Sequence, residues 1–118
     1  MKTSEILIEA RKLIKNPDNW TKHARAKTSK HGLGVDPLNV NATCFCAVGA
    51  VQKVKNCDVD TAYTCPEVKL LSECLPANFH LDRIWSFNDD FKTKHTQIIQ
   101  VFNNAIRLAI KKESQEKN

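Results

Sequence analysis

The chain has few of the residues that interrupt regular structure, with only three glycines and four prolines among 118 residues. This scarcity excludes a loop-rich or disordered class of protein. Long apolar runs are missing too, and no stretch approaches the roughly 20 residues of a membrane-spanning helix. Charged residues follow directly on Ile6–Ile8, so we expect no secretory signal. We therefore expect a cytoplasmic protein with no membrane partner, either bacterial or delivered into a host cell by a non-classical route.

Cysteine pairs with the spacing of metal ligands are also absent. The five cysteines are Cys44, Cys46, Cys57, Cys65 and Cys74. None forms a Cys-x-x-Cys pair and no His-x3-His partner follows, which disfavours a zinc site. The odd number of cysteines and the cytosolic start disfavour a disulfide scaffold. We expect no metal, no cofactor, and free thiols that are mostly buried.

Acidic residues are scarce at both ends of the chain, whose formal net charge is +5. Residues 1–35 hold eight Lys or Arg against three Asp or Glu, and residues 92–118 hold six against two. Residues 36–91 reverse this balance, with four against eight. Such polarity suits electrostatic steering toward a charged partner. Nucleic acid is disfavoured as that partner, because the chain is not uniformly basic.

Strand patterns are missing as well, and apolar residues instead recur at helical spacing. Residues 6–14 and 98–109 each place apolar side chains along one face of a helix. Between them, the pattern predicts helices over about residues 42–53, 64–75 and 80–87. We find no convincing strand, with a short extended piece over residues 35–38 as the one alternative.

The uncharged run over residues 41–51 is the most apolar part of the chain, and its small side chains gather around Gly49. Glycine inside a helix costs about 1 kcal/mol relative to alanine, so we expect another helix to approach closely here, with a bound ligand as the alternative. The sequence predicts an all-α fold. We expect a compact single domain of about five helices over residues 1–112, with a buried Cys/Gly/Ala-rich central helix, and a polar tail over residues 113–118.

Three short segments form a recognisable pattern. They are Asn19-Trp20-Thr21 followed by Ala24-Arg25-Ala26, then Phe45-Cys46-Ala47-Val48-Gly49-Ala50, then Phe87-Asn88-Asp89. This order resembles a small uncharacterised domain family of bacteria and their phages, over nearly the whole chain. Its pattern is Trp-Thr, aromatic-Cys-x-x-Gly-Ala and aromatic-Asn-Asp, and Phe45 replaces the more usual Trp. The resemblance implies a helical domain and no assigned activity. Length and composition are also similar to those of a small Legionella inhibitor of ubiquitin-deamidating and transglutaminating effectors.

Cys46 is the starting point of a catalytic alternative. A thiol near a helix N-terminus has a lowered pKa. His80 or His95 could take its proton, and Asn88 or Asp89 could orient the imidazole, as in a cysteine-dependent hydrolase or transferase. Because the thiol lies inside an apolar run, we favour its burial in the core and no catalytic residue at all.

Two groups of residues are candidates for contact with a partner. The basic segment 22–31 could grip phosphates, so nucleic-acid binding is a second alternative, although the segment lacks an aromatic platform for bases. The last helix is apolar on more than one side, and large aromatics dominate protein interfaces. The candidates are Trp20, Lys22, Arg25, Lys27, Lys30, Trp85, Phe91, Val101 and Leu108.

These observations favour a protein-binding module that regulates, most simply by inhibition, a partner enzyme. The resemblance to the Legionella inhibitor implies that this enzyme is a bacterial effector deamidase or transglutaminase. A homodimer is a further alternative.

Overall fold

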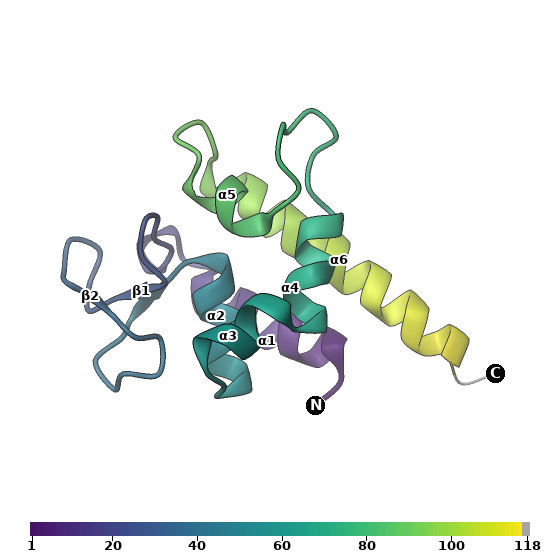
Figure 1. The fold of residues 1–118 in the computed structure, drawn as a ribbon, viewed down its shortest axis with the longest axis horizontal. Helices are drawn as coiled ribbons and strands as arrows, with labels where there is room; N and C mark the ends of the chain where they lie inside the picture. The colour runs from purple at the N-terminus through teal and green to yellow at the C-terminus, as the bar shows by residue number, and fades with distance from the viewer. Residues whose placement is uncertain (117–118) are drawn as a thin grey trace.

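The structure is a computed structural model, and it describes residues 1–116. Six α-helices and three two-residue strands lie within this range. The elements are α1 (Thr3–Ile14), a 3-10 turn η1 (Pro17–Asn19), β1 (Ala26–Lys27), β2 (Gly34–Val35), β3 (Cys44–Phe45), α2 (Ala47–Lys55), α3 (Val59–Thr64), α4 (Pro66–Glu73), α5 (Ile84–Asp89) and α6 (His95–Glu116). Figure 1 shows the strands and their loops beside the helical part of the molecule.

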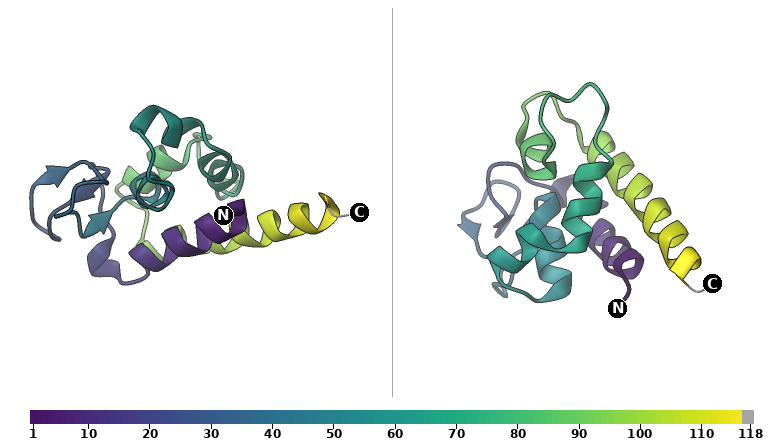
Figure 2. Two further views of the ribbon diagram at one scale, coloured as in Figure 1. Left: turned by 90° about the horizontal axis from the view of Figure 1, so that it is seen from below. Right: turned by 45° about the vertical axis from the view of Figure 1, so that its right-hand side comes forward.

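Helices α1 and α6 lie antiparallel, and Figure 2 shows them side by side. Three hydrogen bonds set this direction, because they join the start of α1 to the end of α6 and the end of α1 to the start of α6. They are Ser4 Oγ to Glu113 Oε1 at 2.6 Å, Arg11 Nη1 to Asn103 Oδ1 at 2.8 Å, and His95 Nε2 with the Ile14 carbonyl oxygen at 2.7 Å. The apolar faces of the two helices pack into one core with α2 and α4. The largest side chains buried there include Phe102, Leu7 and Leu71.

The prediction of an all-α fold is wrong, because the strands form an antiparallel sheet in the order β2-β1-β3. Ala26 lies opposite Val35 on one side and Phe45 on the other. An alternating pattern needs about four or more residues to be visible in a sequence, and each strand here has two. The three strands come from three separate segments of the chain, so only the tertiary structure brings them together.

The apolar run over residues 41–51 is divided between a strand and a helix. The predicted helix begins at Ala42, whereas α2 begins at Ala47. Cys44 and Phe45 pair with β1 instead, and Cys46 becomes the N-cap of the helix. Every residue of α2 from Ala47 to Gln52 is buried.

The other helix boundaries also shift. The predicted helices leave residues 54–63 without a helix, but the helix α3 forms there, with Asp58 as its N-cap. The helix predicted to begin at residue 64 is α4, which begins at Pro66, and its N-cap Cys65 makes no side-chain cap bond. Helix α5 begins at Ile84 rather than at His80, and the Ile84 amide donates to Ser72 Oγ at 2.9 Å.

Helix α6 continues to Glu116, beyond the boundary predicted at Lys112. Glu113 accepts hydrogen bonds from Ser4 Oγ and the Ser4 amide, so its side chain joins the end of α6 to the start of α1. The remainder of the predicted polar tail, residues 117–118, lies outside the described residues. No helix of residues 1–116 is both long enough and apolar enough to cross a membrane.

A buried ion pair links α2 to α4. Lys55 Nζ lies 2.6 Å from Glu67 Oε1, and the Glu67 side chain is 2% exposed. Burial alone would raise the pKa of Glu67, but hydrogen bonds from Lys55 and Thr3 outweigh it, so the pKa is lowered. The ionised carboxylate therefore stabilises the folded chain.

We expect Glu67→Gln to lower the free energy of unfolding at neutral pH by about 2 kcal/mol, because it leaves the Lys55 ammonium without its counter-charge. A lowered carboxyl pKa gives stability that is present above the ordinary value of 4.5 and is lost as the pH falls through the lowered value. The difference between wild type and variant, measured by urea unfolding, should therefore shrink in acid. The control is Glu9→Gln, which removes an exposed pair with Lys12. A Glu67→Gln effect that does not change with pH would contradict this account.

Candidate functional site

The three segments of the sequence pattern meet at one place, which we call the motif junction: Trp20-Thr21, Cys46–Gly49 and Asn88-Asp89. Asn88 is completely buried and connects all three segments. Its Oδ1 accepts hydrogen bonds from Trp20 Nε1 at 2.8 Å and from the Ala47 amide at 3.0 Å. Its Nδ2 donates to the Thr21 carbonyl at 3.1 Å and to Asp89 Oδ1 at 3.0 Å. One amide side chain thus uses both of its ends to hold two segments that lie more than 40 residues before it in the sequence.

Gly49 lets a second backbone pass close to α2. A Cβ atom at this position would lie 1.9 Å from the Arg25 carbonyl oxygen and 2.8 Å from its carbonyl carbon. The same oxygen accepts a hydrogen bond from the Cys46 amide at 3.1 Å. The expectation of a close approach at Gly49 is therefore confirmed, but the approaching backbone is the residue before β1 and not another helix.

The Cys46 thiol closes the first turn of α2. Its Sγ accepts a hydrogen bond from the Gly49 amide at 3.3 Å, and 7% of the residue is exposed. Burial raises the pKa of the thiol to about 11, although hydrogen bonds from the Gly49 and Val48 amides act to lower it. At neutral pH the group is a protonated thiol, which is a poor nucleophile. This geometry favours a capping role for Cys46 over a catalytic one.

We expect Cys46 to resist alkylation in the native protein at pH 7 and to react only on unfolding. The reason is that the attacking species, the thiolate, is both buried and disfavoured. Labelling with an alkylating reagent followed by mass spectrometry measures this directly. Cys57 and Cys74 are only partly buried and serve as internal controls that should react faster. Rapid labelling of Cys46 before unfolding would restore the cysteine-enzyme alternative.

A hollow of about 240 Å³ lies beside Cys46, and we call it the Cys46 hollow. It is lined by His23, Ala24, Arg25, Cys46, Tyr63, Trp85 and Asp89. His23 has a φ of 65°, a left-handed conformation that is uncommon for a non-glycine residue. Its amide donates to Asp89 Oδ1 at 3.0 Å, so the carboxylate at the end of α5 helps to hold this conformation.

The histidines considered for catalysis lie elsewhere. Exposed His80 stacks against Phe79, with ring centroids 4.9 Å apart, and lines a different groove. His95 bonds to the Ile14 carbonyl and lies against Trp20. Of the proposed partners of Cys46, only Asp89 lines the Cys46 hollow, and the Asn88 Nδ2 donates to the Asp89 carboxylate.

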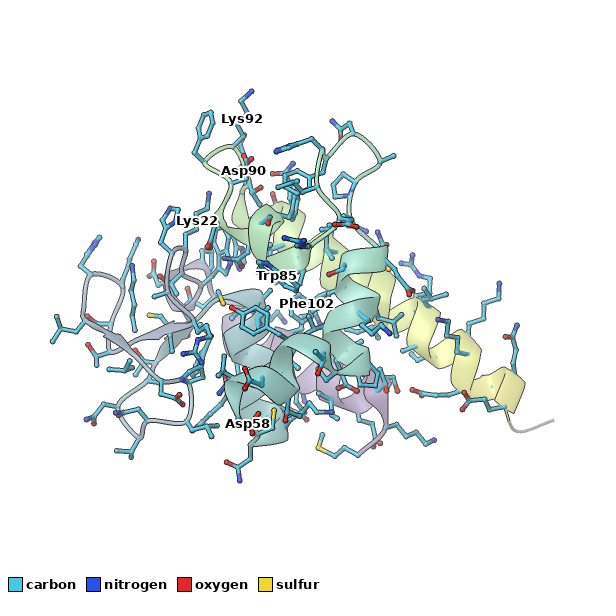
Figure 3. The ribbon with its side chains drawn as sticks, in the orientation of Figure 1. Lys22, Asp58, Trp85, Asp90, Lys92 and Phe102 are labelled. Carbon is cyan, nitrogen blue, oxygen red and sulfur yellow. The ribbon has the colours of Figure 1, made fainter. Side chains whose placement is uncertain are left out.

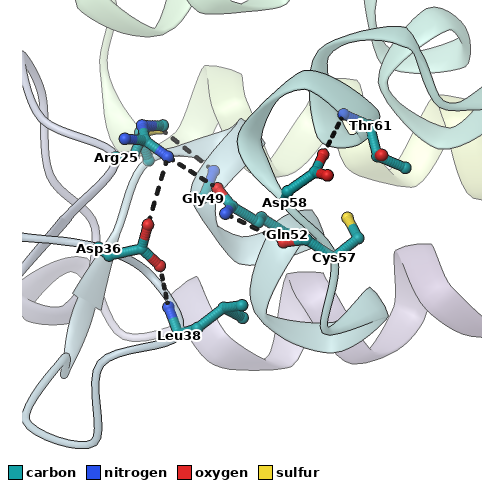
Figure 4. A network of polar contacts seen from close by, with 9 residues as sticks. Arg25, Asp36, Leu38, Gly49, Gln52, Cys57, Asp58 and Thr61 are labelled. Carbon is teal, nitrogen blue, oxygen red and sulfur yellow. Dashed lines mark hydrogen bonds and ion pairs between the residues drawn. The ribbon is translucent and has the colours of Figure 1, made fainter.

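Arg25 lies between α2 and Asp36, the residue that follows β2, as Figure 4 shows. Its Nη1 donates to Gln52 Oε1 at 3.1 Å and lies 3.9 Å from Asp36 Oδ2. Gln52 in turn donates to the Cys57 carbonyl at 3.1 Å. This chain of contacts fixes the guanidinium beside α2.

The other basic candidates differ in their contacts and burial. Lys22 donates to the Asp90 carbonyl at 2.6 Å and lies over the Trp20 ring. Lys30 pairs with Asp18 at 3.0 Å. Lys27 is half-buried in β1. Several of these charges thus have partners within the chain, which weakens the case for a phosphate-binding segment.

The apolar candidates differ in exposure. Val101 is buried and Leu108 is half-buried, so both pack against the core. Trp85 packs edge-on against Tyr63, with ring centroids 5.0 Å apart. Phe91 is 85% exposed, so it presents nearly its whole ring to solvent.

Phe91 borders the Phe91 groove, a depression of about 420 Å³ between residues 76–80 and residues 90–93. Figure 1 shows the two loops that flank it rising above α5. Phe79 and Phe87 form its apolar wall, packed edge-on with ring centroids 5.0 Å apart. This groove is the second candidate site.

Sequence reasoning did not select His23 or Tyr63. No pattern in the sequence marks the left-handed conformation of His23, and Tyr63 belongs to the helix α3, which the sequence did not predict. Both enter the Cys46 hollow only through tertiary packing. Within residues 1–116, no group of three or more His, Cys, Asp or Glu side chains could hold a metal ion.

Comparison with known proteins gives a family but no function. The model of the family of unknown function DUF6197 matches residues 1–108, a range that contains all three segments of the motif junction. No curated protein and no solved structure matches the chain. The similarity to the Legionella inhibitor therefore has no support, whereas the resemblance to an uncharacterised small domain family is confirmed. The chain belongs to DUF6197.

Proposed function

We propose that this chain is a protein-binding module whose contact surface is centred on Phe91 and the Phe91 groove. The exposure of Phe91 is the observation that carries this proposal. A large aromatic ring that is 85% exposed contributes almost no buried apolar surface to the stability of the fold. Aromatic side chains, however, commonly dominate the affinity of protein interfaces.

The loop that carries Phe91 is braced by local hydrogen bonds. The Lys92 amide donates to Asp90 Oδ1 at 2.9 Å, and the Thr93 amide donates to the Asp90 carbonyl at 3.0 Å. Thr93 is itself buried. A ring held in one place loses less conformational entropy on binding than a ring on an unstructured loop, which favours a role in recognition.

The charges around Phe91 suit a partner with an acidic contact surface. Figure 3 shows Lys22 and Lys92 near Asp90 at one edge of the molecule, far from Asp58 at the opposite edge. Asp90 uses its side chain to accept from the Lys92 amide and its carbonyl to accept from Lys22. The ammonium of Lys92 lies 5.6 Å from the centre of the Phe91 ring, so positive charge accompanies the aromatic contact.

We further propose that the partner is an enzyme whose activity falls when this module covers its surface. The proposed setting is the cytoplasm, where five unpaired cysteines would remain reduced. Protein binding through the Phe91 groove requires neither an enzyme as the partner nor a cytoplasmic setting.

The test uses Phe91→Ala. The tagged chain is expressed in its native cells, partners are quantified by mass spectrometry, and affinity is then measured with the purified partner. We expect Phe91→Ala to weaken binding about 30-fold, which corresponds to about 2 kcal/mol. The exposed side chain should have little effect on thermal stability.

Leu33→Ala is the matched control, because Leu33 is also a large apolar residue on a loop and is 79% exposed. It should leave binding unchanged. Size-exclusion chromatography with light scattering tests whether the partner is a second copy of the chain. Wild-type affinity in Phe91→Ala would disprove the proposed surface.

A further inference from the structure

The Cys46 hollow contains polar groups that the fold does not use. The Tyr63 hydroxyl makes no hydrogen bond to another residue of the described range 1–116. Asp89 satisfies the His23 amide and Asn88 with one carboxylate oxygen, Oδ1, which leaves Oδ2 available. The closest contacts of the Arg25 guanidinium use Nη1, which leaves its other nitrogens available. The lining of one small space thus includes three residues with unused donors or acceptors.

The charges of Asp89 and Arg25 both affect the Cys46 thiol and the Tyr63 hydroxyl inside the hollow. Burial is the main cause of the raised pKa of both Cys46 and Tyr63. The negative charge of Asp89 adds to this rise in each case, and the positive charge of Arg25 opposes it. The thiol and the phenol therefore lie within reach of a carboxylate and of a guanidinium, so the hollow has a negative and a positive group.

Aromatic side chains supply an apolar wall. Trp85 and Tyr63 pack edge-to-face at an angle of 88°. The Arg83 guanidinium lies over the Trp85 ring, 5.9 Å from its centre. The side of the hollow formed by these rings suits the apolar part of a ligand.

The first amides of α2 are not available to a ligand. The Ala47 amide donates to Asn88, and the Gly49 amide donates to Cys46 Sγ. The Ala50 amide donates to the Cys46 carbonyl. An anion such as phosphate, which would need these amides, is therefore not the ligand that this helix end is arranged to bind.

We propose that the Cys46 hollow binds a small zwitterion of the α-amino-acid class. Asp89 would accept hydrogen bonds from the ammonium group, Arg25 would donate to the carboxylate, and Tyr63 and Trp85 would contact the side chain. A volume of about 240 Å³ is below the range of typical drug-sized pockets and matches so small a ligand. This site is separate from the Phe91 groove and does not depend on the protein-binding proposal.

The experiment is an NMR titration of the ¹⁵N-labelled chain with each standard amino acid. The best binder is then compared with its methyl ester, which lacks the carboxylate, and with its N-acetyl derivative, which lacks the ammonium. We expect one or more amino acids to shift the amide signals of residues 23–25 and 46–49. Each derivative should bind about tenfold or more weakly, because it loses one charged contact.

Two variants test the assigned contacts. Asp89→Asn keeps an oxygen to accept from the His23 amide, so the fold should persist while affinity falls about tenfold. Tyr63→Phe keeps the packing against Trp85 and removes only the hydroxyl, so a smaller loss is expected. Asp82→Asn changes an almost fully exposed carboxylate and is the control that should bind as wild type does.

The proposal is overturned if no amino acid shifts these signals, or if both derivatives bind as well as the parent. Wild-type affinity in a folded Asp89→Asn variant would also overturn it. Binding of partners through the Phe91 groove is read independently, so failure of one proposal leaves the other testable.

Discussion

Gly49→Ala is expected to lower the free energy of unfolding by about 3 kcal/mol, equivalent to a fall of about 10 °C in the melting temperature. The added methyl group would lie 1.9 Å from the Arg25 carbonyl oxygen, well inside van der Waals contact. That carbonyl cannot easily move away, because the Cys46 amide bonds to it and the next residue, Ala26, is paired on both sides in the sheet. The steric cost therefore exceeds the gain of about 1 kcal/mol in helix propensity that alanine brings.

The matched control for this substitution is Gly34→Ala. A Cβ atom there would meet only the Ala24 Cβ, at 3.7 Å, and the Ala26 carbonyl oxygen, at 3.9 Å, which are ordinary contacts. We expect its effect to stay within about 0.5 kcal/mol. Thermal and urea unfolding of both variants measure the difference. Equal effects of the two substitutions would show that the close approach at α2 is not what requires glycine.

Asn88→Ala is expected to have an effect of similar size, about 3 kcal/mol. It removes the acceptor for Trp20 Nε1 and for the Ala47 amide, and unsatisfied donors of this kind cost about 1–3 kcal/mol each when buried. It also leaves a cavity at a fully buried position. Urea unfolding measures the loss, and a change in tryptophan fluorescence should accompany it because Trp20 loses its partner.

Asn88→Asp separates hydrogen bonding from packing. The new carboxylate keeps the acceptor but replaces the Nδ2 donor, and it would face the Thr21 carbonyl and the Asp89 carboxylate. Burial and this repulsion should raise its pKa in the folded state. A raised carboxyl pKa destabilises the fold above the ordinary pKa of the group, and this penalty disappears as the pH falls. Asn104→Ala, which removes only bonds to Gln100 and Arg107, is the control. A pH-independent loss in Asn88→Asp would contradict the assigned contacts.

The long helices α1 and α6 could be predicted because their signals are local. The apolar faces of α1 and α6 extend over several turns, so their 3.6-residue period is visible without knowledge of the partners. The start of α2 could not be placed this way. Residues 42–46 are as apolar as the helix that follows them, and only the pairing of Cys44 and Phe45 with β1 makes them a strand.

The candidate sites were likewise predicted only in part from the sequence. The pattern of Trp-Thr, Cys-x-x-Gly-Ala and Asn-Asp singled out the residues of the motif junction, but it did not show that Asn88 joins all three segments. The catalytic alternative paired Cys46 with His80 or His95, whereas the structure places His23 beside it. A histidine near in space to a cysteine cannot be chosen from a sequence that contains four of them.

Chain composition and periodicity alone established the long helices α1 and α6, the charge distribution and the need for close packing at Gly49, because each depends on residues near one another in sequence. The sheet, the burial of the Cys46 thiol, the Cys46 hollow and the exposure of Phe91 were decided by tertiary structure. Each of these depends on contacts between segments tens of residues apart, such as Arg25 with Gly49 and Asn88 with Ala47. Contacts of that kind have no period along the chain, so they become visible only when the chain is folded.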